Sequence, residues 1–366
     1  MSESITISVD AMGGDNGPEI VVQGAALALI ERPKTKFIFH GREDELKPLV
    51  AKYENLQAVS EIRHSNNVIS MDDKPSQALR KGRGDSSMWN ALQSVKDGEA
   101  DAAISGGNTG ALMAMATFCL RPMEGISRPA LAALWPTLRS ESVVLDVGAT
   151  VGADEEQLID FSILGAAMAR ALFDVDLPSI GLLNVGVEEV KGLEAVKDAS
   201  KQLQAHSGRG FKYHGFVEGD DLGKGTVDVV VTEGFTGNIA LKTAEGTARQ
   251  VASYLRTALS QSWLSKLGAL LASGAMRTLR SKMDPRTANG AVFLGVNGIV
   301  IKSHGGTDEI GFKSALGLTY EMAHNKLIKK IGEGLQEYAA HDEADKAQLA
   351  AEQSEKDKSN EEVGSA

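Results

Sequence analysis

Four cationic or titratable side chains stand beside glycine-rich stretches of the sequence: Lys191, Lys242, Lys302 and His304. Glycine has no side chain to keep a ligand away from backbone N–H groups, and the start of a helix adds roughly half a positive charge. Clustered N–H donors and cations suit a small oxyanion such as phosphate. The chemistry that these residues indicate is therefore the binding and orientation of an anion.

Motifs for several other reactions are absent from the sequence. It contains no G-x-x-x-x-G-K-[ST], no G-x-G-x-x-G, no G-x-S-x-G, and no H-E-x-x-H or EF-hand pattern. The single cysteine, Cys119, lies in an apolar stretch, which argues against a disulfide, an activated thiol or a cysteine-ligated metal. We therefore expect a reaction that uses no metal, no cofactor and no covalent enzyme intermediate.

The glycine-rich stretches share one arrangement, because each follows a β-rich apolar run and precedes a helical pattern. The runs cover residues 5–9, 102–104, 143–145, 180–183, 227–231 and 298–302, and the loops cover residues 10–19, 105–110, 146–154, 184–192, 232–238 and 303–309. Near-continuous Val, Ile and Leu are typical of strands buried on both faces of a parallel sheet. The alternation predicts an α/β fold, a mostly parallel sheet with helices on both faces in three layers.

The six loops are expected to meet. In such folds the loops after the carboxyl ends of the strands line the ligand crevice, which predicts one shared site. The alternative for any single loop is that its glycines only end a strand and cap a helix. Six similar loops together favour the shared site.

Composition and charge narrow the class of protein. Of 366 residues, 42% are hydrophobic and 24% are charged, which is typical of a soluble folded protein. The N-terminus shows no basic leader followed by an apolar run, so we expect no signal peptide and a cytoplasmic location. The net charge of −11 argues against a general nucleic-acid binder.

Three stretches stand apart from the α/β pattern. Residues 71–87 are polar and charged, which predicts a mobile surface loop carrying Arg80, Lys81 and Arg83. Residues 249–286 carry seven Arg or Lys against one Asp, with leucines and Trp263 at helical spacing, which predicts a basic amphipathic helical segment. Residues 341–366 carry eight acids and three bases, which predicts a disordered tail. We expect residues 1–340 to form a single catalytic α/β domain.

Six motifs in a fixed order resemble the phosphate acyltransferase family, the acyl-ACP:phosphate acyltransferases of bacterial phospholipid synthesis (ACP, acyl carrier protein). They are VDAMGGDNGP, SGGNTGALM, LDVGA, GLLNVGVEEVKG, VVVTEGFTGNIALKTAEG and IKSHG, and the resemblance spans about residues 5–337. It implies a homodimer with a fold similar to the phosphotransacetylase and isocitrate dehydrogenase group. It also implies transfer of a fatty acyl group from acyl-ACP to inorganic phosphate, giving acyl phosphate for the acylation of glycerol 3-phosphate.

The resemblance also implies roles for individual residues. The family's reactive positions fall on Lys191, Asn238 and His304. The positions implied in substrate binding are Asp10, Gly13, Gly14, Asp15, Gly107, Asn108, Thr109, Gly110, Asp146, Gly148, Asn184, Gly234, Gly237 and Gly305. Two positions depart from the family pattern, since Thr150 replaces an Asn and Glu233 replaces an Asp.

The reaction chemistry suggests how the three reactive residues divide the work. Phosphate is already an anionic nucleophile, so the task is to orient it and to stabilise charge on the thioester carbonyl. We hypothesise that Lys191 and His304 bind phosphate and stabilise the oxyanion, while Asn238 positions the substrate. By its sequence alone Lys191 also fits an ordinary surface lysine, and Asn238 an ordinary helix N-cap.

Residues 249–286 leave two interpretations open. Leucines beside cations fit a helix lying in an anionic membrane surface, and they also fit a helix pair packed on the core or in a dimer. The resemblance favours peripheral membrane contact, because acyl phosphate must reach a membrane glycerol-3-phosphate acyltransferase. The acidic ACP is expected to dock either on Arg80, Lys81 and Arg83 or on the basic residues of 277–286.

Two other functions compete with the one that the resemblance implies. One is a phosphotransacetylase-like enzyme that uses an acyl-CoA thioester. The other is a membrane-recruited scaffold that binds acyl-ACP without turning it over. The density of anion-binding loops argues against the scaffold, because docking alone would not need them.

Overall fold

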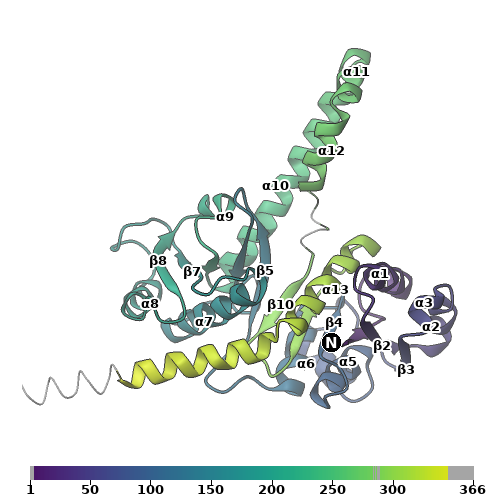
Figure 1. Ribbon diagram of the computed structural model, residues 1–366, viewed down its shortest axis with the longest axis horizontal. Coiled ribbons are helices and arrows are strands. Elements are labelled where there is room, and N and C mark those ends of the chain that lie inside the picture. The colour runs from purple at the N-terminus through teal and green to yellow at the C-terminus, as the bar shows by residue number, and fades with distance from the viewer. Residues whose placement is uncertain (1–3, 283, 285, 287–288, 345–366) are drawn as a thin grey trace, which may run out of the picture.

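An 11-stranded sheet runs through the molecule (Figure 1). This computed structural model describes residues 4–282, 284, 286 and 289–344, with the side chains of 278–282 outside the description. The strands are β1 (Ile5–Asp10), β2 (Thr35–Gly41), β3 (Ser60–His64), β4 (Ala102–Ser105), β5 (Ala130–Pro136), β6 (Glu141–Leu145), β7 (Ser179–Leu183), β8 (Lys212–Val217), β9 (Val229–Val231), β10 (Ala291–Leu294) and β11 (Ile299–Lys302). The six apolar runs are all strands, as predicted.

The sheet consists of two parallel blocks that run in opposite directions. Its order is β3-β2-β1-β4-β11-β10-β5-β6-β9-β7-β8. The first five strands in this order are mutually parallel, and so are the last four. β10 is antiparallel to β11 and β5, and β5 is antiparallel to β6, so the direction reverses between the blocks. The predicted mostly parallel α/β sheet is confirmed.

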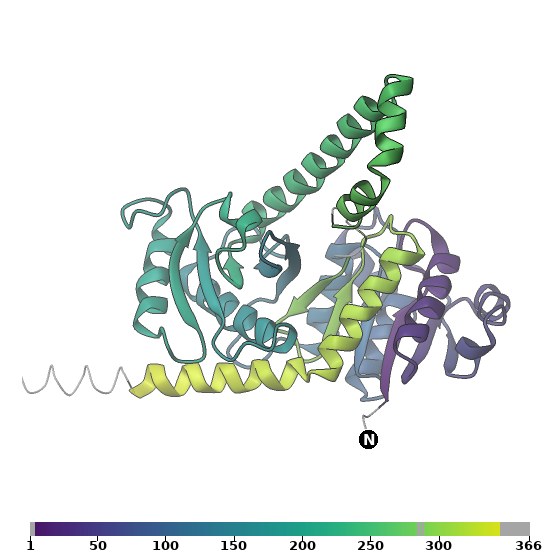
Figure 2. The ribbon, with the colours of Figure 1, turned by 45° about the horizontal axis from the view of Figure 1, so that its top comes forward.

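Helices cover both faces of the sheet, which confirms the predicted three layers (Figure 2). The helices are α1 (Gly17–Glu31), α2 (Glu43–Val50), α3 (Glu54–Gln57), α4 (Pro75–Gly82), α5 (Ser87–Lys96), α6 (Thr109–Leu120), α7 (Glu155–Leu172), α8 (Glu194–Ala205), α9 (Asp221–Lys224), α10 (Gly234–Ser260), α11 (Trp263–Leu271), α12 (Ser273–Lys282) and α13 (Glu309–His324). Apolar residues of α1, α7 and α13 share one core cluster. Those of α5 and α6 form the other, against which the first turns of α10 pack.

The prediction of a mobile loop over residues 71–87 is wrong, because α4 occupies residues 75–82 and α5 begins at Ser87. Pro75 opens α4, where its missing N–H costs nothing. Ala78 and Gly82 then form a narrow buried side, while the basic residues lie on the exposed side. A short helix with so few apolar residues gives almost no periodic signal in the sequence.

The acidic tail begins later than predicted. A helix over residues 327–344 continues past residue 341, and the rest of the predicted tail, residues 345–366, lies outside the described residues. Leu327 and Ile331 at the start of this helix join the core formed with α7 and α13. Packing therefore fixes where this helix begins.

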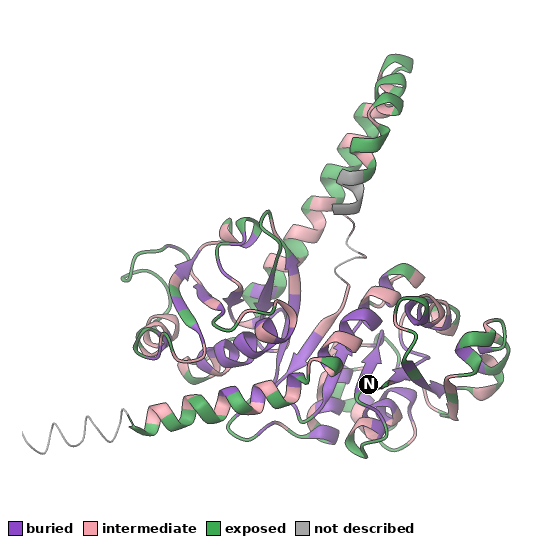
Figure 3. Cartoon of the chain, viewed as in Figure 1, coloured by how far each residue is buried: buried purple, intermediate pink, exposed green. Residues whose placement is uncertain are grey.

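The predicted basic segment forms helices that project away from the sheet (Figure 1). The second half of α10, with α11 and α12, stands clear of the body, and Figure 3 shows these helices as mostly exposed. Their exposed apolar residues include Trp263 at 73%, Leu270 at 69% and Leu271 at 81% exposure. None of the helices among the described residues is both long enough and apolar enough to cross a bilayer.

Candidate active site

The six glycine-rich loops fall into two groups rather than one. Loops 10–19, 105–110 and 303–309 follow β1, β4 and β11, which are adjacent and parallel. Loops 146–154, 184–192 and 232–238 follow β6, β7 and β9, which run in the opposite direction. The two groups therefore follow strands that point in opposite directions, because the sheet reverses at β10 and β5, and the single shared site stays a prediction. We call the first group the His304 group and the second the Lys191 group.

The loops of the His304 group are built around a buried carboxylate. Asp10 ends β1, and its Oδ2 accepts a 2.6 Å hydrogen bond from Ser105 Oγ at the end of β4. Ser105 Oγ in turn accepts from the N–H of Gly107 at 3.0 Å. A side chain on Gly13 would place Cβ 2.5 Å from Asp10 Oδ2 and 2.8 Å from Gly107 N. Burial raises the pKa of Asp10, against the opposing effects of Ser105 and Lys302. Asp10 and Gly13 thus allow the loops after β1 and β4 to pack closely together at the carboxyl ends of these strands.

Lys302 joins the loop after β4 to the loop after β11 through hydrogen bonds of its buried ammonium group. It is only 8% exposed, and its Nζ donates to the carbonyl oxygens of Gly106, at 3.2 Å, and Ser303. Burial lowers the pKa of Lys302 to about 8, against the charges of Asp15 and Asp10. The main role of the ammonium group is therefore to hold the backbone of these loops.

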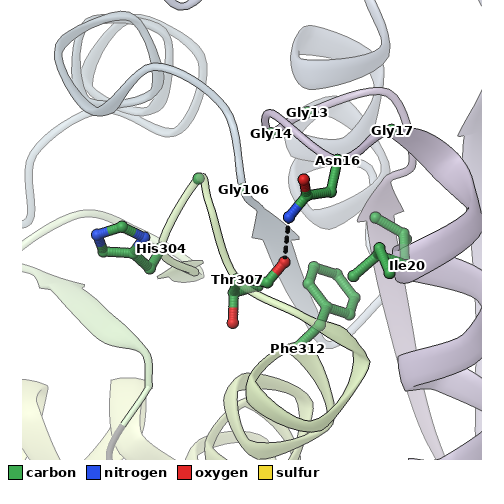
Figure 4. A pocket seen from close by; sticks show the side chains of 11 residues that line it. Gly13, Gly14, Asn16, Gly17, Ile20, Gly106, His304, Thr307 and Phe312 are labelled. Carbon is green, nitrogen blue, oxygen red and sulfur yellow. Dashed lines mark hydrogen bonds between the residues drawn. The ribbon is translucent and has the colours of Figure 1, made fainter. Parts of the chain in front are cut away.

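His304 borders a shallow pocket with the glycines of both neighbouring loops (Figure 4). Gly14 has a φ of +107°, and a side chain there would lie 3.1 Å from the carbonyl oxygen of Gly305. That oxygen accepts a 2.9 Å hydrogen bond from the N–H of Asp15. Asn16 donates to the carbonyl oxygen of Thr307 at 2.8 Å, as the dashed line marks. The two loops therefore meet backbone to backbone, with the imidazole at their rim.

The imidazole of His304 is set up as a neutral hydrogen-bond donor. The N–H of Gly306 donates to His304 Nδ1 at 3.2 Å, which assigns the ring proton to Nε2. Desolvation of the ring lowers the pKa of His304, and the positive charges of Lys242 and Lys302 add to this effect against Glu245 and Asp15. At neutral pH the Nε2–H group can therefore donate to an oxyanion.

Asn289, which the sequence analysis did not identify, holds the His304 loop. Its Oδ1 accepts from the N–H of His304 at 3.0 Å, and its Nδ2 donates to Ser303 Oγ at 3.0 Å and to the carbonyl oxygen of Gly311 at 2.8 Å. One side chain thus fixes the backbone on both sides of the imidazole. No sequence signal marks it, because it follows the helical projection 14 residues before Ser303.

Replacing Asn289 by alanine is expected to lower kcat about 10- to 100-fold, because a displaced imidazole loses its alignment. The aspartate variant keeps an acceptor for the His304 N–H and should lose less. Steady-state kinetics should show the effect in kcat rather than in KM. Asn297→Ala is the matched control, since Asn297 Nδ2 also donates to two backbone carbonyls, those of Arg121 and Pro122, in another turn. An equal loss in the control would contradict a positioning role.

The Lys191 group contains a second buried carboxylate, Asp146. Its two oxygens accept from the N–H groups of Leu131, Gly148, Ala149 and Thr150 and from the Thr150 hydroxyl, at 2.7–3.1 Å. These bonds fold the loop after β6 around the carboxylate. Asp146 therefore shapes this loop, and its predicted contact with substrate stays a prediction.

The start of α10 sits directly on that loop. Gly234 and Gly237 are buried, and a side chain on either would run into backbone carbonyl oxygens, of Thr150 and Asp146 respectively. Asn238 follows on the exposed side, and the Cβ position of Gly148 lies 3.5 Å from its Cβ. Because Gly234 and Gly237 lack side chains, α10 can pack against the loop after β6. Asn238 then lies on the exposed side of the helix.

The two residues that depart from the family pattern have structural partners. Thr150 donates to Asp146, as above, and Glu233 caps α10 by accepting from the N–H groups of Thr236 at 2.7 Å and Phe235 at 2.9 Å. Burial opposes ionisation of Glu233, but these hydrogen bonds and that from Gly152 outweigh it and lower the pKa of Glu233. Both residues therefore form hydrogen bonds that hold their loops.

Lys191 lies in the loop after β7. Asn184 holds this loop by donating to the carbonyl oxygens of Gly186 at 3.1 Å and Lys191 at 3.0 Å. The exposed Lys191 ammonium pairs with Glu188 at 2.8 Å, and this carboxylate raises the pKa of Lys191. Asn184 is therefore a loop-forming residue, while the lysine itself faces solvent.

The remaining predicted residues lie at the start of α6. Asn108 caps this helix by accepting from the N–H of Ala111 at 2.9 Å, and it donates to the carbonyl oxygens of Met71 at 2.6 Å and Asp73 at 3.1 Å. Thr109 and Gly110 begin the helix, and a side chain on Gly110 would meet Pro75 at 2.9 Å. The loop after β4 is thereby joined to α4.

Within the described part of the chain, no hydrogen bond or ion pair joins Lys191, Asn238 and His304. Helix α10 begins against the loop after β6, and Lys242 and Glu245, two to three turns from its start, act electrostatically on His304. In the same described residues, no group of three or more His, Cys, Asp or Glu side chains is arranged to hold a metal ion.

Comparison with known proteins gives consistent matches over most of the chain. Residues 5–330 match the family model described as "Fatty acid synthesis protein". A protein of Sinorhizobium fredii named phosphate acyltransferase is 59% identical over 334 residues, covering 91% of this chain and 96% of that protein. A phosphate acyltransferase of Brucella canis is 60% identical over 327 residues, covering 89% and 94%.

Solved structures show the same fold at low sequence identity. A phosphotransacetylase from Streptococcus pyogenes aligns with a TM-score of 0.60 and 19% identity, covering 87% of this chain and 94% of that one. The EutD phosphotransacetylase from Staphylococcus aureus aligns with a TM-score of 0.56 and 14% identity, covering 90% and 96%. The predicted similarity to the phosphotransacetylase fold is confirmed.

Proposed function

The chain belongs to the phosphate acyltransferase family, and from this premise we propose that it transfers a fatty acyl group from acyl-ACP to inorganic phosphate. It is an acyltransferase of fatty acid and lipid synthesis. Identity of 59–60% with relatives named phosphate acyltransferase is the observation that carries the proposal. The products would be acyl phosphate and free ACP, and residues 1–340 would act as one catalytic unit.

The proposed reaction is a direct displacement at the thioester carbonyl. A phosphate oxygen attacks the carbonyl carbon, the C–S bond breaks, and the proton of HPO₄²⁻ passes to the departing thiolate. Charge develops on the carbonyl oxygen, and we assign His304 Nε2–H as the donor to it. Asn238 would position the substrate, and Lys191 would supply a cation from the other loop group. Gly13, Gly14 and Gly305 would let the ligand approach the backbone.

The experiment that tests this function supplies the full chain with phosphate and a long-chain acyl donor. Acyl phosphate is trapped with hydroxylamine and measured as the hydroxamate. Palmitoyl-ACP and palmitoyl-CoA are compared as donors at equal concentration, and we expect the carrier-protein thioester to be preferred. Preference for the CoA thioester would support a phosphotransacetylase-like enzyme. Binding of acyl-ACP without product would support a scaffold.

The acidic carrier protein would dock on a basic surface near the site. Arg80, Lys81 and Arg83 are exposed at and after α4, and the segment just before α4 is held to the loop after β4 by Asn108, which donates to the carbonyl oxygens of Met71 and Asp73. Arg277 lies on α12, whose chain returns to the site at Asn289. Both surfaces are candidates for this contact.

We further propose a homodimer whose projecting helices contact an anionic membrane and deliver acyl phosphate to a membrane acyltransferase. The apolar residues of α11 are 46–81% exposed at Trp263, Leu264, Leu267, Leu270 and Leu271. Lys266 lies within the same helix and Arg277 in the next. Apolar side chains beside cations fit the surface of a bilayer that carries negative headgroups.

Flotation with anionic liposomes is expected to recover the wild-type protein and to lose the Leu270→Glu/Leu271→Glu variant by more than tenfold. Burial of each leucine in the bilayer surface contributes about 1.5–3 kcal/mol to the free energy of membrane binding, and a glutamate at the same position does not provide this contribution. Ile30→Glu/Leu138→Glu is the matched control, because those side chains are 77% and 91% exposed elsewhere on the body. Failure of the wild type to float, or undiminished flotation of the α11 variant, would contradict the proposal.

A further inference from the structure

We propose that Lys242 is a further substrate-binding residue, the cation on α10 that holds the attacking phosphate beside His304. The inference rests on the proposed acyl transfer to phosphate and locates the phosphate subsite within it. Lys242 belongs to neither loop group, because it lies in the third turn of α10, beyond the loop over residues 232–238.

The position of α10 is fixed on two sides. At its start Gly234 and Gly237 lie against backbone of the loop after β6. Further along, Ala240, Leu241 and Ala244 pack on the core cluster that lies under α5 and α6. Residues at i, i+4 and i+7 share one side of a helix, so Asn238, Lys242 and Glu245 face the same way. The helix therefore cannot turn this side away from the site.

Lys242 lies on the same face of α10 as Asn238 and within electrostatic range of the His304 imidazole. Its charge acts on His304 from α10, while Lys302 acts from β11, Asp15 from the loop after β1, and Glu245 from α10 as well. Lys242 also acts on Lys302, so both basic groups of the His304 loop lie within its field.

Lys242 is also the cation that can reach a ligand. The ammonium of Lys302 is buried and donates to the carbonyl oxygens of Gly106 and Ser303. The side chain of Lys242 is 53% exposed, and its Nζ lies 3.0 Å from Glu245 Oε2. Glu245 has a second cation in Arg249, at 3.8 Å, so it keeps a partner when Lys242 turns to a phosphate.

The arrangement suits a phosphate dianion that must point one oxygen at a carbonyl. Lys242 would approach the dianion from the helix, and backbone N–H groups of the His304 loop would approach it from the other side. The neutral Nε2–H of His304 would then be free for the carbonyl oxygen. A cation at this position binds the nucleophile without competing for the oxyanion.

The test compares Lys242→Gln, Lys242→Arg and Lys191→Gln in steady-state kinetics with varied phosphate. We expect Lys242→Gln to raise KM for phosphate roughly 10- to 100-fold, with KM for acyl-ACP changed less than twofold, and Lys242→Arg to restore most of the loss. Lys201→Gln is the matched control, because Lys201 is exposed and also pairs with an acid three residues away, at 2.6 Å. Unchanged KM for phosphate in Lys242→Gln, or an equal rise in the control, would overturn the proposal.

A second readout separates binding from a general structural defect. The charge of Lys242 lowers the pKa of His304, so its removal should move the acidic limb of the pH profile of kcat to higher pH. Calorimetric titration with phosphate alone tests the subsite without any acyl donor. Phosphate binding that depends on Lys242 would support the subsite even if no acyl phosphate forms, whereas absent binding to the wild type would refute it.

Discussion

Replacing His304 by alanine is expected to lower kcat about 10²–10³-fold, because the variant loses the N–H donor placed for the developing oxyanion. The structure supplies the donor's state, since Gly306 N–H occupies Nδ1 and leaves the proton on Nε2. His304 is exposed at the rim of its pocket and takes no part in the core, so folding should be unaffected. Initial rates at saturating phosphate and acyl-ACP measure the loss.

A conservative variant and a pH profile test the assigned role. His304→Gln keeps a side-chain N–H donor and should recover part of the rate. The pKa of His304 is lowered below 6.5, so with rates expressed per phosphate dianion, wild-type activity should persist below pH 6.5 and fall as the ring is protonated. In the glutamine variant this acidic limb should disappear. Wild-type turnover by His304→Ala would remove His304 from the mechanism.

Replacing Gly237 by alanine is expected to destabilise the protein by about 1–3 kcal/mol or more, because the added Cβ would clash with buried backbone that cannot shift easily. The added Cβ would overlap the carbonyl oxygen of Asp146, a backbone atom rather than the end of a flexible side chain. The helix would have to shift, and Asn238 would shift with it. Urea unfolding followed by circular dichroism should give a lower midpoint at an unchanged slope, and kcat should fall in parallel.

Gly246→Ala in the same helix is the control for this prediction. A Cβ at Gly246 would meet no atom within 4 Å, so alanine should stabilise the helix by about 0.5–1 kcal/mol. Opposite signs at the two glycines would show that the backbone contact, and not helix propensity, makes Gly237 necessary. If Gly237→Ala were as stable as the wild type, the contact between α10 and the loop after β6 would be looser than described.

Much of the site could be read from residue types alone. Short apolar runs followed by glycines gave the strands and their loops correctly, because burial on both faces of a sheet leaves a local pattern. His304 was identified because it lies between such a strand and a Gly-Gly turn. Asn289 could not be found in this way, since its role comes from hydrogen bonds to residues 14 to 22 positions later in the chain.

The division of the six loops into two groups could not be read from the sequence for a related reason. Strand direction depends on pairing, and the pattern of a strand is the same whether its neighbour runs parallel or antiparallel. β10 and β5 reverse the sheet, which separates the Lys191 group from the His304 group. The amphipathic pattern of α10 was visible, but which loops it would connect was not.

The sequence by itself determined the α/β class, the strands, the anion-binding character of the loops and the family, because these depend on local periodicity and on motifs in order. Only the tertiary structure decided which loops are neighbours, which charges act on His304, and which polar side chains hold the backbone of the loops. Asp146, Asn184 and Lys302 have their polar atoms occupied by loop partners, whereas Lys242 remains accessible. The physical reason is that hydrogen bonding and Coulomb interaction depend on distance in space, which separation along the chain does not specify.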